Sequence, residues 1–65
     1  MGDLIWEVSA FDDVVYIKAA TREDCEQIIA REMGGEVVEL CTYKTIDKVP
    51  EGEGWFDVVG VHGAV

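Results

Sequence analysis

Residues 21–35, with the sequence TREDCEQIIAREMGG, contain the clearest structural signal of the chain. Thr21 stands at an N-cap position, and Asp24 three residues later makes a variant of the capping box. The apolar residues recur at the spacing of one helix face and are Cys25, Ile28, Ile29 and Met33. Gly34 and Gly35 can adopt the positive φ at which helices end. The segment predicts an amphipathic helix over residues 22–33, which needs a second layer to bury its apolar side.

The residues before this helix predict a β-hairpin. Residues 4–10 alternate with the period of a half-buried strand, and residues 14–19 are rich in β-branched and aromatic side chains. Phe11, Asp12 and Asp13 lie between them and predict a tight turn, because an Asp side chain can hydrogen-bond the local backbone.

After the helix, residues 36–43 and 55–59 predict two further strands, separated by an irregular stretch at residues 44–54 that contains the only proline. Residues 60–65 predict a frayed end. The order β-β-α-β-β predicts an α+β fold, a two-layer sandwich of one helix on a mostly antiparallel four-stranded sheet. The strand order stays open, because residues 44–54 could cross the sheet or form a hairpin. At 65 residues, the whole chain (1–65) is expected to be a single small acidic domain.

One helix covers only one face of a sheet. The residues expected beneath the helix are Leu4, Trp6, Val8, Val15, Ile17, Val38, Leu40, Phe56 and Val58. The residues expected on the uncovered face are Glu7, Tyr16, Glu39, Tyr43, Trp55 and Asp57. The uncovered face would then mix aromatic rings with carboxylates.

The chain carries 14 acidic residues against 5 basic ones, a formal net charge of −9. Such a charge repels nucleic acid and anionic membranes and attracts basic protein surfaces. The basic residues are scattered, whereas direct nucleic-acid binding needs a basic stripe. No apolar run approaches the roughly 18 residues that span a bilayer, and neither a signal peptide nor a disulfide framework is evident. We therefore expect a cytoplasmic protein that binds neither nucleic acid nor a membrane directly.

No group of residues predicts catalysis, a cofactor or a metal ion, and we expect a protein that is not an enzyme. The acidic pairs Asp12–Asp13 and Glu51–Glu53 lie in predicted turns and lack the ligand spacing of a calcium loop. Cys25 is expected to act as a small buried hydrophobe on the helix. Cys41 is expected on the uncovered sheet face, which would make it the more reactive thiol and the one on which a small enzyme would depend.

The acidic surface is the remaining functional signal. Carboxylates along one surface can imitate the phosphates of a nucleic acid and dock onto a basic groove of another protein. Aromatic side chains would provide the desolvated anchor that charge lacks. The candidate partner-binding residues are Glu7, Tyr16, Glu23, Glu26, Glu39, Tyr43, Trp55 and Asp57. Two alternatives stay open: an acidic surface that only confers solubility, and a small homo-oligomeric structural or accessory protein, such as a homodimer, that pairs with itself through the open sheet face or an edge strand.

Residues 16–25, YIKAATREDC, resemble the strand-into-helix passage of small phage-encoded inhibitors of bacterial defence, the anti-CRISPR proteins in particular. The resemblance covers a short part of the chain and includes no motif that aligns residue by residue. It implies a non-enzymatic inhibitor in the bacterial host cytoplasm, which occludes a basic nucleic-acid-binding surface of a CRISPR effector complex.

Overall fold

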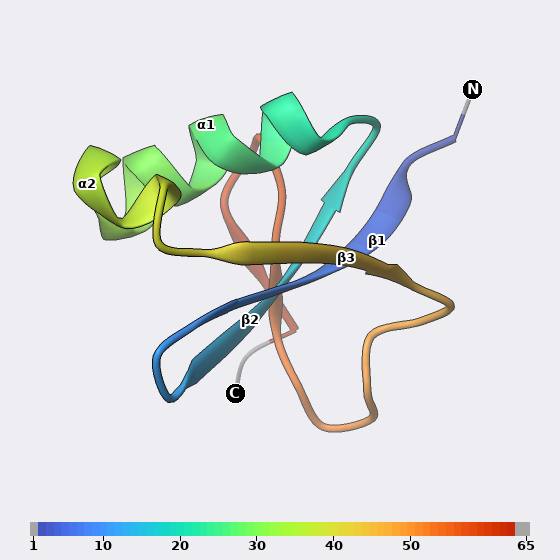
Figure 1. Ribbon diagram of the computed structural model, residues 1–65. Coiled ribbons are helices and arrows are strands. Elements are labelled where there is room, and N and C mark those ends of the chain that lie inside the picture. The colour runs from blue at the N-terminus through green and yellow to red at the C-terminus, as the bar shows by residue number, and fades with distance from the viewer. Residues whose placement is uncertain (1, 64–65) are drawn as a thin grey trace.

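The N-terminal hairpin forms the centre of the sheet in the computed structural model, which describes residues 2–63 (Figure 1). Strands β1 (Leu4–Ala10) and β2 (Asp13–Ala19) pair antiparallel along their whole length, from Leu4 opposite Ala19 to Ala10 opposite Asp13. Only Phe11 and Asp12 remain in the turn. The predicted hairpin is confirmed, with β2 beginning one residue earlier than expected.

The predicted helix is also confirmed. Helix α1 (Arg22–Met33) begins after Thr21, whose extended backbone lets its side-chain oxygen accept a hydrogen bond of 3.1 Å from the Asp24 amide. It ends at Gly34, whose φ of 108° is readily adopted only by glycine. The side chains that α1 buries against β1 and β2 are Cys25, Ile28 and Ile29.

The strand predicted over residues 36–43 is wrong in its first half. Gly35–Val38 forms a one-turn helix, α2, and the following turn leads into β3 (Thr42–Ile46). The reversal at Gly34 turns the chain, and α2 is closed by hydrogen bonds from Val37 to the Gly34 carbonyl and from Leu40 to the Val37 carbonyl. Val37 and Val38 still pack on the core, so α2 buries these apolar side chains as a strand would have done. Leu40, expected beneath the helix, is 55% exposed.

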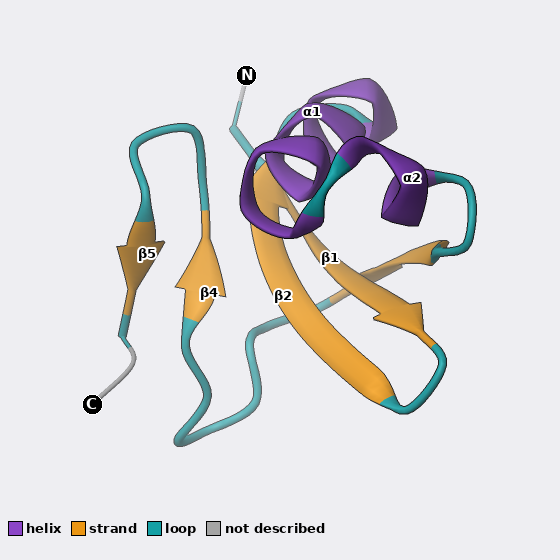
Figure 2. Cartoon of the chain, turned by 90° about the vertical axis from the view of Figure 1, so that its left-hand side faces the viewer, coloured by secondary structure: helices purple, strands orange, loops and turns teal. Residues whose placement is uncertain are grey.

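The sheet has five strands in the order β3-β1-β2-β4-β5, one more than expected. It is mostly antiparallel, as expected, but the pairing of β4 with β2 makes it mixed. β4 is shorter than predicted (Trp55–Phe56) and runs parallel to β2. The end expected to fray contributes β5 (Val61–His62), antiparallel to β4, while residues 64 and 65 lie outside the described part. Because β3 and β4 lie on opposite sides of the central hairpin, residues 47–54 cross the sheet on the side away from the helices (Figure 2).

The hydrophobic core lies between α1 and the β1–β2 hairpin, with one contribution from the segment after α2. Its buried members are Val8, Ala10, Ile17, Ala19, Cys25, Ile28, Ile29 and Cys41. Trp6 covers the edge of this cluster, and its indole nitrogen donates a 3.0 Å hydrogen bond to the Ala19 carbonyl. Among the described residues, no helix is long and apolar enough to cross a membrane.

We expect Thr21→Ala to lower the free energy of unfolding by about 1 kcal/mol, because the first turn of α1 loses the acceptor for the Asp24 amide. Urea unfolding followed by circular dichroism measures this change. Thr21→Ser keeps the hydroxyl and should stay close to the parent protein. An alanine variant as stable as the serine variant would show that the cap contributes nothing.

Candidate protein-interaction surface

The uncovered face of the sheet carries Glu7 and Tyr16, as predicted. Glu7 stands opposite Tyr16 on β2 and opposite Lys44 on β3, and paired residues of a ladder share a face. Their neighbours Val8 and Ile17 are buried on the other face, beneath α1. Glu7 is not a free charge, because its carboxylate lies 3.5 Å from the Lys44 ammonium.

Trp55 also lies on the uncovered face, since the adjacent Phe56 pairs with the buried Ile17. Its ring stacks on His62, with 4.4 Å between the ring centroids. The Lys18 ammonium lies 3.9 Å from the indole centroid, within cation–π range. Trp55 is thus held between two neighbours and half-buried, which ties β5 to the sheet instead of leaving the indole free for a partner.

Tyr43 was expected on the uncovered face, and that placement is wrong. It pairs with Val8, so its side chain lies on the helix-covered face and packs against the core. Its hydroxyl donates a 3.0 Å hydrogen bond to the Val38 carbonyl, and burial raises the pKa of Tyr43 to about 12. The error follows from the strand boundary: with α2 inserted, the alternation assumed over residues 36–43 no longer holds.

The remaining predicted acids are dispersed over the molecule. Glu39 lies in the exposed turn after α2 and not on the sheet. Glu23 is exposed on the first turn of α1, and Glu26 pairs with Arg22 across one helix turn at 3.3 Å. The structure therefore does not gather the predicted partner-binding residues on one face.

Both thiols are buried in the core. Cys25 is fully buried, as predicted, and burial with the nearby Asp24 and Glu26 charges raises the pKa of its thiol to about 12. Cys41 was expected on the uncovered face, but it is only 9% exposed and its sulfur lies 3.2 Å from the Val37 carbonyl. It precedes β3 and joins the core where the chain returns from α2. Neither thiol is presented to solvent as a nucleophile.

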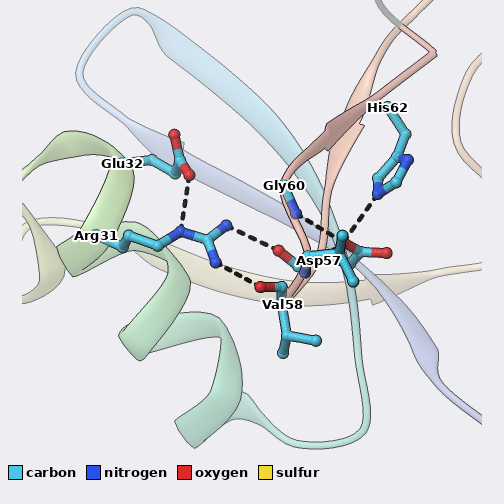
Figure 3. A network of polar contacts seen from close by, with 7 residues as sticks. Arg31, Glu32, Asp57, Val58, Gly60 and His62 are labelled. Atoms are coloured by element: carbon cyan, nitrogen blue, oxygen red, sulfur yellow. Dashed lines mark hydrogen bonds and ion pairs between the residues drawn. The ribbon is translucent and has the colours of Figure 1, made fainter.

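The turn between β4 and β5 is held by several hydrogen bonds to the Asp57 side chain (Figure 3). One carboxylate oxygen of Asp57 lies 2.8 Å from the Val59 amide, 3.1 Å from the Gly60 amide and 2.9 Å from Nε2 of His62. The Asp57 amide also donates to the Gly60 carbonyl at 2.9 Å. Asp57 therefore organises the turn and is not an unengaged surface charge.

Arg31 fastens this turn to α1 (Figure 3). Its guanidinium donates to the Val58 carbonyl at 2.7 Å and to the Asp57 carbonyl at 2.8 Å, while Nε pairs with Glu32. Between α1 and the turn lies a groove of about 230 Å³, lined by Asp24, Gln27, Ile28, Arg31 and Val58. Within residues 2–63, no three His, Cys, Asp or Glu side chains are grouped as a metal site would need.

The most exposed large apolar side chains were not among the predicted anchors. Phe11 is 86% exposed, Val59 81% and Val58, expected beneath the helix, 70%. Val58 points away from the core because β4 ends at Phe56 and the Asp57 turn begins at once. For Phe11 a signal was present in the sequence, since an aromatic residue beside two aspartates is unusual in a hairpin turn.

The Asp57 carboxylate should make the fold sensitive to acid. Partial desolvation raises its pKa, but the contact with His62 and the hydrogen bonds from the Gly60 and Val59 amides outweigh it and hold the pKa of Asp57 below its ordinary 3.8. A carboxyl group whose pKa is lower in the folded state than in the unfolded state stabilises the fold at pH values above its unfolded-state pKa. This contribution is lost as the pH falls through the folded-state pKa.

Asp57→Asn keeps an acceptor oxygen for the two amides but removes the charge. We expect the variant to be less stable than the parent at neutral pH and the difference to shrink as the pH falls below 3.8. Urea unfolding of both proteins over a series of pH values measures the difference. A difference that stays constant through the acid range would contradict the assigned role of the Asp57 charge.

Comparisons with protein-family models, with curated protein sequences and with solved structures found no match to this chain.

Proposed function

We propose that this chain is a non-enzymatic protein-binding domain, which docks its acidic surface onto a basic, nucleic-acid-binding groove of another protein. The observation that carries the proposal is the way the few basic side chains are used. Lys18 lies over Trp55, and Lys44 is paired with Glu7. Arg22 is paired with Glu26, and Arg31 binds Glu32 and the β4–β5 turn. Four of the five basic residues are thereby engaged within the molecule.

The acidic side chains are mostly not engaged in this way. The acidic partners of the ion pairs are Glu7, Glu26, Glu32 and Asp57. Within residues 2–63, the exposed acidic residues outside these pairs are Asp3, Asp12, Asp13, Glu23, Glu36, Glu39, Asp47, Glu51 and Glu53. A partner therefore meets a surface whose unpaired charges are almost all negative, on a molecule with principal extents of 27, 27 and 20 Å.

Such a surface suits a groove that normally holds a nucleic acid. Duplex DNA presents one negative charge per ~1.7 Å of its axis, and a basic groove gains free energy by neutralising closely spaced anions. Long-range attraction accelerates encounter, and the association rate falls as salt rises. The chain would then compete with the nucleic acid for the groove. The resemblance of residues 16–25 to anti-CRISPR proteins favours a CRISPR effector complex in a bacterial host as this partner.

A homodimer is the second candidate, because β3 is an edge strand of the sheet. Two β3 strands could pair antiparallel and continue the sheet across both copies. Lys44 occupies the middle of β3, so a symmetric antiparallel pairing would bring two Lys44 side chains together on one face. The crossing segment 47–54 also runs on the side of the sheet that the helices leave open (Figure 2). Both features favour the monomer.

We expect the immobilised chain to retain a basic nucleic-acid-binding protein from a bacterial lysate at low salt and to release it in a salt gradient. The purified partner should lose its DNA or RNA in competition with this chain. A triple variant with Glu23, Glu36 and Glu39 changed to Gln should elute at lower salt, since all three are exposed and form no ion pair with the described part of the chain. Retention that salt and these substitutions leave unchanged would refute the proposal.

Sedimentation equilibrium at high micromolar concentration should show a monomer. Lys44→Thr is the matched variant. It removes the charge at the middle of β3 and therefore increases any tendency of the β3 edges of two copies to pair. A parent protein that dimerises under these conditions would favour the homodimer over the monomeric inhibitor.

A further inference from the structure

Phe11 has a backbone conformation that its side chain does not favour. Its φ is 57°, and it is the only residue other than glycine with a positive φ among residues 2–63. Phe11 is the first of the two turn residues between Ala10 and Asp13, which pair as the last rung of the hairpin. A positive φ at the first turn residue alone is the pattern of a type II′ turn, in which glycine is strongly preferred. Bulky residues rarely adopt this conformation.

Packing does not compensate for this conformation. The Phe11 side chain is 86% exposed, more than any other large apolar side chain described. The hairpin is held by seven paired residues on each strand and by core contacts of Val8 and Ile17, none of which needs an aromatic ring at the tip. The turn would form more readily with glycine or asparagine at this position. A side chain that neither the backbone nor the core needs is a candidate for an external contact.

The surroundings of the tip indicate what kind of contact it makes. Asp12 and Asp13 directly follow Phe11 in the chain, are exposed and form no ion pair within residues 2–63. Strand β3 begins at Thr42 opposite Ser9, so the segment between α2 and β3 lies toward the tip end of the hairpin, on the same left-hand side of Figure 1. That segment adds the exposed Glu39 and the 55% exposed Leu40. One end of the molecule thus combines a projecting aromatic ring with unpaired carboxylates.

We propose that Phe11 is the apolar anchor of this chain, inserted into an apolar pocket that lysine or arginine side chains border on a protein partner. The inference rests on the proposed function and names the point of contact within it. Aromatic side chains dominate interface energetics when a pocket desolvates them, while flanking charges orient the partners and accelerate encounter. The short turn on a seven-residue ladder fixes the backbone that carries the ring before binding, which lowers the entropy lost on docking.

The first test needs no partner. Phe11→Gly and Phe11→Asn place residues that tolerate a positive φ in the turn, and each should leave the melting temperature unchanged or raise it by a few degrees. Asparagine serves as the second variant because it does not add the backbone freedom that glycine gives the unfolded chain. A fall in melting temperature for both variants would show that the ring serves the fold and would overturn the proposal.

The second test measures binding. The protein retained by the immobilised parent chain is purified and titrated against each variant by calorimetry. Phe11→Gly and Phe11→Asn should weaken binding at least tenfold. Val59→Ser, which removes a similarly exposed apolar side chain from the β4–β5 turn, should leave the affinity within about twofold. Asp12→Asn with Asp13→Asn should weaken binding more than Glu51→Gln with Glu53→Gln, which removes the same charge from the crossing segment.

The outcomes separate the anchor from the proposed function. Loss of affinity only in the Phe11 variants and the neighbouring aspartate variant supports the anchor. Equal affinity of the parent and Phe11→Gly, together with strong salt dependence, overturns the anchor and leaves acidic docking in place. Equal effects of the two acidic double variants also count against a contact centred on the tip. A parent chain that retains no basic protein refutes both proposals.

Discussion

The contact between α1 and the β1–β2 hairpin is the interaction on which the rest of the structure depends. Val8, Ile17, Cys25 and Ile29 are almost fully enclosed there, and burial of a valine or isoleucine side chain contributes about 1.5–3 kcal/mol. A domain of this length buries only about 60% of the surface of its unfolded chain, so a few residues supply much of the net stability. Helix α2, the edge strand β3 and the β4–β5 hairpin all pack around this centre. They are shorter than α1, β1 and β2 and contribute fewer buried side chains.

The charge of −9 limits how those outer elements can attach. Repulsion between carboxylates opposes a compact state, and the chain has few cations with which to offset it. Three of the five cations lie at junctions: Arg31 joins α1 to the β4–β5 turn, Lys44 joins β3 to β1, and Lys18 of β2 lies on Trp55 of β4. Each holds two elements together, and the exposed surface is left with unpaired acids. The same distribution thus serves cohesion and provides the negative surface on which acidic docking would rely.

The two turns that expose apolar side chains differ in how they are held. The β4–β5 turn is fixed by the Asp57 carboxylate and the Arg31 guanidinium. These polar contacts account for the conformation of the turn that carries Val58 and Val59. The β1–β2 turn has no comparable side-chain bracing among the described contacts, and it carries an aromatic residue at the position that glycine prefers. In the β4–β5 turn the local preferences of the residues agree with the observed backbone, whereas at Phe11 in the β1–β2 turn they conflict with it. That conflict is why Phe11, and not the valine pair, is the stronger candidate for an external role.

Local signals in the sequence determined the hairpin and α1, because alternation, capping and the helix stop act within a few residues of one another. They also placed Glu7, Tyr16 and Cys25 correctly. The remainder was decided by tertiary structure. The reversal at Gly34 made α2 out of residues with strand preference and thereby moved Tyr43 and Cys41 to the core. The parallel pairing of β4 with β2, and the use of Asp57 as a turn brace, depend on Ile17 and Arg31, which lie far from them in the sequence. No periodicity within a short window reports such contacts, because the residues meet only when the hairpin and α1 have already packed together.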